Sequence, residues 1–215
     1  GGINIEVKRE IDGWRLNGSK CFVLDGHVAS LLIVAARSAG VAGDPQGLSL
    51  FMLPRDTAGV TVTRSTMVDA HNAARVALSD VPLPADALLG TADAAWPVLQ
   101  AALDAGRAAA AAELLGIADE VFERTLGYLK ERKQFGRLIG EFQALQHRAA
   151  MLYVDIELAR AALMKALQAL DAQPERAAEA VAIAKAKCGS AATLAVQEGV
   201  QLHGGMGMTD QFEIG

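Results

Sequence analysis

The chain has 215 residues, which is enough for one large domain or two small ones. Half of it is apolar (52%) and 21% is charged, an ordinary globular composition that excludes a disordered chain. The formal net charge of −5 argues against nucleic acid or an anionic membrane surface as the main partner, because neither would be attracted electrostatically.

Residues 1–83 carry the pattern of β-strands. Ile3, Ile5 and Val7 alternate with polar residues, and short apolar runs recur downstream, separated by turn signals such as Asn17-Gly18. The runs cover residues 21–23, 31–36, 48–53, 60–63 and 75–78. Short strands without intervening helices predict a small antiparallel β-barrel or sandwich domain. We expect Val81-Pro82-Leu83-Pro84 to end the β region, because proline breaks both a ladder and a helix.

Residues 84–215 are predicted to be helical, since apolar residues recur there in steps of three and four. The first stripe contains Leu99, Leu103, Gly106, Ala110, Leu114, Ile117 and Val121. The second contains Phe142, Leu145, Ala149, Leu152, Ile156, Ala159, Leu163 and Leu170. The third contains Ala177, Val181, Ala184, Cys188, Ala191 and Ala195. Stripes of this length are typical of helices packed side by side in a bundle.

The predicted fold class is therefore α+β, with a small β domain followed by a domain of the four-helix-bundle type. Three helices leave one apolar seam open, so we expect a missing fourth helix and also an oligomer, a dimer or a tetramer. The chain opens at Gly1 without a Met and stops at Gly215 inside a motif, so both ends are expected to be cut.

The two cysteines, Cys21 and Cys188, lie far apart in the sequence, which fits a reducing compartment and a cytoplasmic location. The cysteine and histidine spacings predict no metal site. No apolar stretch reaches the ~18 residues that a membrane span needs, so no membrane association is expected.

The segment from Glu131 to Gly136 joins the first and second predicted helices. It combines a guanidinium, an amide and an aromatic ring, which suit the diphosphate and the adenine of a dinucleotide. The alternative is a charged helix terminus whose Phe135 plugs the end of the bundle.

A second glycine-rich segment, Gln201 to Thr209, follows the third predicted helix. Its glycines would let backbone N–H groups approach a ligand closely. A Rossmann fingerprint is excluded, because this segment follows a helix and no βαβ unit is present. The alternative is a plain helix C-cap.

The two segments together resemble the acyl-CoA dehydrogenase family. Its members carry R-x-x-F-G, then F-Q-x-x-Q, then Q-x-x-G-G-x-G, and the chain has these motifs at residues 132–136, 142–146 and 201–207. Residues 13–20 resemble the family's G-W-x-L-N-G-x-K hairpin, and residues 81–90 resemble its V-P-x-x-x-x-L-G link. The resemblance spans essentially the whole chain and implies a middle β domain followed by a helical C-terminal domain.

The resemblance implies FAD, bound across a subunit interface. The residues that would hold the diphosphate and adenosine end for the neighbouring subunit are Arg132, Gln134, Phe135, Gln201, Gly204 and Gly205. The family's flavin-ring segment, W-[IV]-[ST]-N, corresponds to Phe22–Asp25. Phe22 can cover a ring face, whereas Leu24 departs from the pattern and has no hydroxyl to offer the flavin edge.

Asp104 and Arg107 match the acid and arginine of the family's L-D-x-x-R stretch, which helps to hold the acyl-CoA. The alternative is an intrahelical ion pair. Gly106 stands where some family members carry the catalytic carboxylate, and others carry it beyond the segment that this chain covers. The catalytic residue is therefore unassigned, and Gly106 is taken as leaving room for a bulky acyl group.

The resemblance thus implies an FAD-dependent acyl-CoA dehydrogenase. It would desaturate an acyl-CoA at its α and β carbons and pass electrons to an electron-transfer flavoprotein. One alternative is a non-catalytic or half-site subunit that completes the flavin pocket of a heteromeric enzyme. An acyl-CoA oxidase is a further alternative, and it differs in oxygen access.

Overall fold

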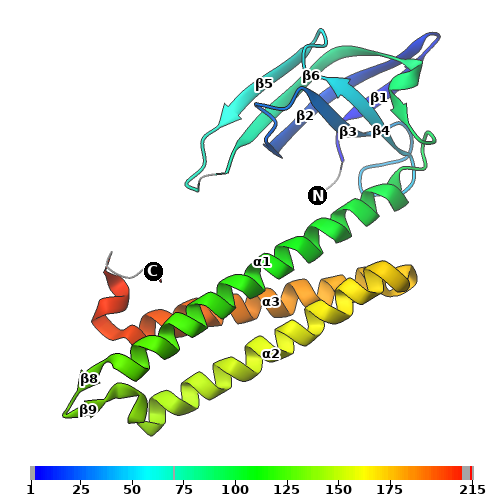
Figure 1. Cartoon of the computed structure of the whole chain (residues 1–215). Helices are drawn as coiled ribbons and strands as arrows, with labels where there is room; N and C mark the ends of the chain where they lie inside the picture. Colours follow the sequence, from blue (N-terminus) through cyan, green and yellow to red (C-terminus); the bar gives the residue numbers. More distant parts are fainter. Residues whose placement is uncertain (1–2, 70, 210–213, 215) are drawn as a thin grey trace. The chain divides into compact units, whose positions relative to one another are not determined.

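The computed structural model describes residues 3–69, 71–209 and 214. The chain divides into two compact units, Gly1–Gln100 and Ala101–Gly215. The first is a β unit and the second consists of long helices, so the predicted α+β class is confirmed (Figure 1).

The β unit contains a seven-stranded sheet in the order β5-β6-β2-β1-β3-β4-β7 (Figure 1). The strands are β1 (Glu6–Glu10), β2 (Gly13–Leu24), β3 (Leu31–Arg37), β4 (Leu48–Pro54), β5 (Val60–Ser65), β6 (Ala73–Pro84) and β7 (Leu88–Leu89). Neighbouring strands pair antiparallel except β1 and β3, which meet in parallel at Glu6 and Arg37. The sheet is therefore mixed, although the sequence predicted a purely antiparallel one.

The core of the β unit lies on one face of this sheet, where every second residue is buried. Trp14 and Phe51 meet edge to face there, with ring centroids 5.2 Å apart. The other large buried side chains of this core are Ile5, Val7, Leu16, Leu32, Val34, Leu53, Val76, Leu78, Val81 and Leu83. Such alternation is what a sheet with one buried face requires.

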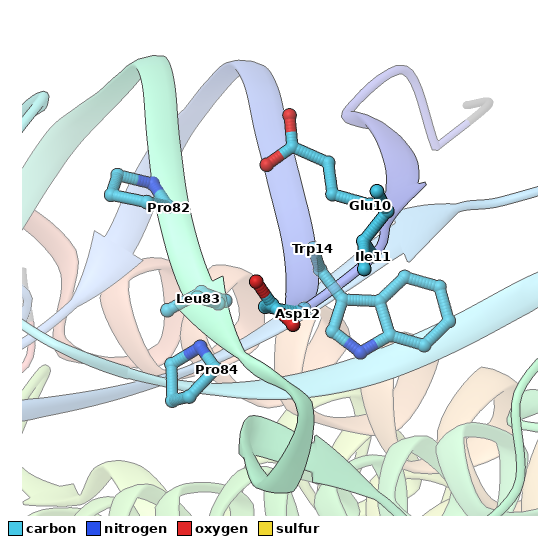
Figure 2. Close-up of a pocket in the computed structure, with 8 residues that line it drawn as sticks. Glu10, Ile11, Asp12, Trp14, Pro82, Leu83 and Pro84 are labelled. Carbon is cyan, nitrogen blue, oxygen red and sulfur yellow. The ribbon is translucent and has the colours of Figure 1, made fainter.

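Strand β6 ends at Pro84, within the segment where the sequence predicted the end of the β region, although Pro82 and Pro84 lie inside the ladder and the two-residue strand β7 still follows. Strand β6 runs through to Pro84, with Pro82 opposite Arg15 and Pro84 opposite Gly13 on β2. On its other edge, β6 pairs with β5 only up to Leu78. After this residue no β5 residue in the described part of the chain covers that edge. Alternate residues of a strand direct their N–H groups to opposite edges, so both prolines can face that open edge without breaking the ladder. Figure 2 shows Pro82, Leu83 and Pro84 beside Trp14 and the turn that contains Ile11 and Asp12.

The helical unit is built on three long helices. They are α1 (Trp96–Glu131), α2 (Gln143–Ala172) and α3 (Pro174–His203), and Pro174 occupies the first turn of α3. The six predicted stripe residues of α3 are all buried, and so are Ala149, Leu152, Ile156, Ala159 and Leu163 on α2. The stripes predicted for these two helices are therefore confirmed in their main part.

The stripe predicted for α1 is wrong in register. The buried residues of this helix are Asp104, Ala108, Ala111, Leu115, Ala118, Val121, Thr125 and Leu129, whereas Leu103 and Ile117 are exposed. Because α1 has apolar residues around most of its circumference, two stripes compete and periodicity alone cannot choose between them. None of the helices in the described part of the chain has both the length and the apolar character that crossing a bilayer requires.

Candidate functional site

The C-terminal end of α1 leads into a tight hairpin that presents Phe135. The N–H of Ile139 donates to the carbonyl of Arg132 at 2.9 Å, and β8 (Lys133–Gln134) pairs with β9 (Arg137–Leu138). Phe135 and Gly136 form the turn, with φ of 53° and 79°. A bulky residue in this left-handed region is an outlier. The side chain of Phe135 is also 89% exposed. This residue therefore costs free energy twice, through its strained backbone and through its water-exposed apolar ring.

The exposed ring of Phe135 contacts one aromatic neighbour, and an arginine lies over that neighbour. Phe142, the residue before α2, meets it edge to face with centroids 6.2 Å apart. The guanidinium of Arg137 lies over the ring of Phe142, 4.2 Å from its centroid. The tip of the hairpin is thus a preformed apolar surface with a cation beside it.

The C-terminal end of α3 is shaped by glycines. Gly204 has φ 63° and ψ −141°, a conformation that essentially only glycine adopts. A Cβ built on Gly204 or Gly205 would meet nothing within 4 Å. Both residues and Gln201 are exposed, so their backbone is open to an incoming group.

The ends of α1 and α3 lie together, which brings the two predicted cofactor segments into one place. Leu129, Ile139 and Leu202 form a small buried cluster between them. The rings of Tyr128 and His203 stack with centroids 4.3 Å apart. Beside them is a hollow of about 570 Å³, lined by Arg124, Gly127, Tyr128, Glu131, Arg132 and His203.

This arrangement fits the diphosphate and adenosine end of a dinucleotide. Within the described residues the guanidinium of Arg132 has no hydrogen-bond or ion-pair partner, so it can bind an anion. The open backbone at Gly204 and Gly205 lets a ligand approach without meeting a side chain. Phe135 adds a flat apolar face. All of these groups belong to the helical unit.

The predicted flavin-ring segment belongs to the β unit. The register of β2 against β6 shifts between Lys20 and Val23, and the shift is a β-bulge with Phe22 at φ 52°. The bulge turns Phe22 outward, and Phe22 and Leu24 are 71% and 72% exposed. An exposed aromatic ring on a strained backbone is available to stack on a planar group.

The predicted substrate residues lie near the start of α1. Nη1 of Arg107 donates to Oδ1 of Asp104 at 2.6 Å, which is the intrahelical pair that the sequence left open. Gly106 lies on the exposed side of the helix, and a Cβ there would meet nothing within 4 Å. Among the described residues no group of histidine, cysteine, aspartate or glutamate side chains could hold a metal ion.

Sequence reasoning missed the residues that support this site. Tyr128 lies one turn before Arg132, and its four-residue spacing places the two on one helix face. His203 was noted only as part of a glycine motif, and Phe142 only as part of a stripe and of the F-Q-x-x-Q motif, without a role beside Phe135. Nothing in the sequence pairs Tyr128 with His203, because their contact depends on how α1 and α3 pack.

Residues 94–215 match the family model for the C-terminal domain of acyl-CoA dehydrogenase, and residues 2–81 match that for its middle domain. A probable acyl-CoA dehydrogenase of Bacillus subtilis is 34% identical over 100% of the chain and 57% of its own length. The butyryl-CoA dehydrogenase structure of Megasphaera elsdenii has a TM-score of 0.89 at 28% identity, over 99% of the chain and 56% of that structure. A glutaryl-CoA dehydrogenase in complex with glutaryl-CoA gives a TM-score of 0.89 at 27% identity, over 99% of the chain and 54% of that structure.

The chain therefore belongs to the acyl-CoA dehydrogenase family. It spans a little over half the length of the curated relatives it matches.

Proposed function

We propose that the chain is the middle and C-terminal part of an FAD-dependent acyl-CoA dehydrogenase. The observation that carries this proposal is the meeting of two distant segments, Arg132–Phe135 and Gln201–Gly205, at one end of the helical unit. A guanidinium, an exposed aromatic ring and an open glycine backbone are the groups that a dinucleotide needs, and family membership makes FAD the candidate.

In this proposal each residue has a binding role. Arg132 and Gln134 hold the diphosphate, Phe135 covers the adenosine, and the backbone of Gly204 and Gly205 allows close approach, with Gln201 beside it. Phe22 and Leu24 contact the flavin ring. When bound, FAD supplies a hydride acceptor for the β-carbon of an acyl-CoA.

Distance along α1 supports a cofactor shared between subunits. Arg107 lies on α1 and Arg132 directly follows its last residue, Glu131, so the two arginines are roughly 37 Å apart at 1.5 Å per residue. In our proposal Asp104 and Arg107 hold the acyl-CoA bound by their own subunit, whereas the Arg132 end serves the cofactor of a neighbour. A homo- or hetero-oligomer, a dimer or a tetramer, is thus part of the proposal.

A second candidate function rests on Gly106. This position carries no carboxylate, and the carboxylate nearest to it along α1, that of Asp104, is buried on another face of the helix. A half-site subunit that completes the flavin pocket of a heteromeric enzyme would look the same. In the first candidate the catalytic carboxylate comes from outside the chain.

Transfer of electrons to an electron-transfer flavoprotein and a cytoplasmic location also belong to the proposal. The location is supported by two free cysteines, Cys21 exposed and Cys188 buried.

Anaerobic titration of the full-length protein with a panel of acyl-CoAs tests the activity. We expect at least one of them to bleach the flavin absorbance and yield the enoyl-CoA. A flavin-containing protein that no acyl-CoA bleaches would reject the stand-alone enzyme and favour the half-site subunit.

A further inference from the structure

Helix α3 lies very close to α1 at Gly199. A Cβ at this position would lie 2.6 Å from Cγ1 of Val121 and 3.4 Å from Oγ1 of Thr125, both on α1. The first distance is far inside van der Waals contact, so only glycine allows the two helices to come this near. The hydroxyl of Thr125, itself buried, donates to the carbonyl of Val121 at 2.7 Å and leaves no polar group unpaired at the contact.

One helical turn beyond this contact, towards the C-terminal ends of the two helices, the rings of Tyr128 and His203 stack. His203 follows Gly199 by four residues and Tyr128 follows Thr125 by three, and their rings stack at an interplanar angle of 24°. His203 is 3% exposed, and its Nδ1 lies 2.8 Å from the carbonyl oxygen of Gly199. The imidazole is therefore fixed by its own helix on one side and by the Tyr128 ring on another.

Each ring is joined directly to one of the proposed cofactor segments. The N–H of Arg132 donates to the carbonyl of Tyr128 at 2.9 Å. On the other side, Gly204 follows His203, and the loop folds back so closely that a Cβ on Gly207 would lie 3.0 Å from Cβ of His203. A movement of Tyr128 relative to His203 would therefore change the distance between the Arg132 guanidinium and the Gly204–Gly205 backbone.

We propose that Tyr128, through its stack on His203, is the positioning residue that sets the spacing between the two halves of the cofactor site. This inference rests on the proposed function, in which both halves hold one FAD. In our proposal this role belongs to the aromatic ring, whose stack on His203 joins the two helices. Removing the ring of Tyr128 should therefore make the spacing between the two halves of the site less well defined, although the residues that contact FAD are all still present.

The test uses the full-length protein freed of its flavin, with FAD and ADP affinities measured by fluorescence and calorimetric titration. The variants are Tyr128→Leu, which removes the ring, and Tyr128→Phe, which keeps it. A matched control is Tyr153→Leu, because Tyr153 stacks on Phe122 in the same helical unit with centroids 6.0 Å apart. Thermal unfolding is recorded for each variant, so that binding is compared well below the midpoint.

We expect Tyr128→Leu to weaken FAD and ADP binding about tenfold, and Tyr128→Phe and Tyr153→Leu to stay within about twofold of the wild type. Wild-type affinity in Tyr128→Leu, or an equal loss in Tyr153→Leu, would overturn the positioning role alone. A full-length wild type that binds no FAD would overturn this role together with the proposed function.

Discussion

Asp104 and Arg107 form an ion pair that is buried at only one end. The side chain of Asp104 is 7% exposed and that of Arg107 is 50% exposed, with 2.6 Å between Oδ1 and Nη1. The carboxylate therefore depends on this arginine, whereas most of the guanidinium remains available to another anion. Such asymmetry suits a residue that both neutralises a buried charge and meets a ligand.

Replacing Arg107 by Gln should be costly, because it leaves the buried Asp104 carboxylate without its cation. We expect a loss of about 2 kcal/mol in the free energy of unfolding, together with weaker acyl-CoA binding. Glu157→Gln is the matched control, since it breaks another i,i+3 pair, to Arg160, between half-exposed side chains. That variant should lose less than about 0.5 kcal/mol and bind acyl-CoA normally. Equal losses in the two variants would contradict this account.

Gly204 and Gly205 should respond differently to alanine. Gly204→Ala forces a Cβ into a conformation that only glycine tolerates, so it should cost about 1–3 kcal/mol of stability. Gly205→Ala places its methyl in open space and should leave the melting temperature unchanged. Both should weaken FAD binding. Undiminished FAD affinity in Gly205→Ala would show that the ligand does not occupy that space.

Sequence periodicity predicted the buried face of a helix correctly where the apolar residues lie mainly on one face. The third stripe was confirmed residue by residue, since α3 has apolar residues mainly on one face. On α1 the buried stripe includes Ala108, Ala111 and Ala118, which are smaller and less hydrophobic than the exposed Leu103 and Ile117. Hydrophobicity therefore favoured the wrong face, and only packing against α2 and α3 decided it. Strand β6 could continue through Pro82 because one of its edges has no neighbouring strand there, which the sequence alone does not show.

Motif resemblance marked Arg132, Phe135, Gln201 and the glycines as contact residues, and their role stays a prediction. The structure places Arg132 and His203, which lie in the two marked segments, on one hollow. The residues that support these segments were not predictable. The stack of Tyr128 on His203 joins residues 75 positions apart through a helix crossing at Gly199. No local pattern encodes such a crossing.

Cys188 should make stability fall at alkaline pH. Burial raises the pKa of its thiol, and Lys185 opposes this effect. The unfolded thiol, with a pKa of about 8.5, loses its proton first as pH rises. The stabilisation is thus fully present below that pH and is lost as pH rises through the folded pKa.

Urea unfolding of the wild type and of Cys188→Ala between neutral pH and about pH 10 checks this expectation. The deficit of the alanine variant at neutral pH, about 1 kcal/mol for the lost packing, should shrink as pH rises. The exposed Cys21 provides the control, and Cys21→Ala should follow the wild-type curve. If the stability deficit of Cys188→Ala did not change with pH, the raised pKa of the Cys188 thiol would be contradicted.

Gly106→Leu tests whether this glycine makes room for the acyl group. A Cβ at residue 106 meets nothing within 4 Å, and leucine favours helix over glycine by about 1 kcal/mol, so stability should not fall. Binding of branched or ring-bearing acyl-CoAs should weaken. Gly116→Leu, at a similarly open and exposed position of α1, should leave acyl-CoA binding unchanged. Unaltered affinity in Gly106→Leu would remove residue 106 from the acyl pocket.

The flavin content of the purified full-length protein tests the central claim most directly. We expect a yellow protein that carries non-covalent FAD, about one per chain, and that loses it when Arg132 is replaced by Ala. A protein that stays colourless and takes up no FAD from an excess of the cofactor would contradict the assignment of a flavin site to the ends of α1 and α3.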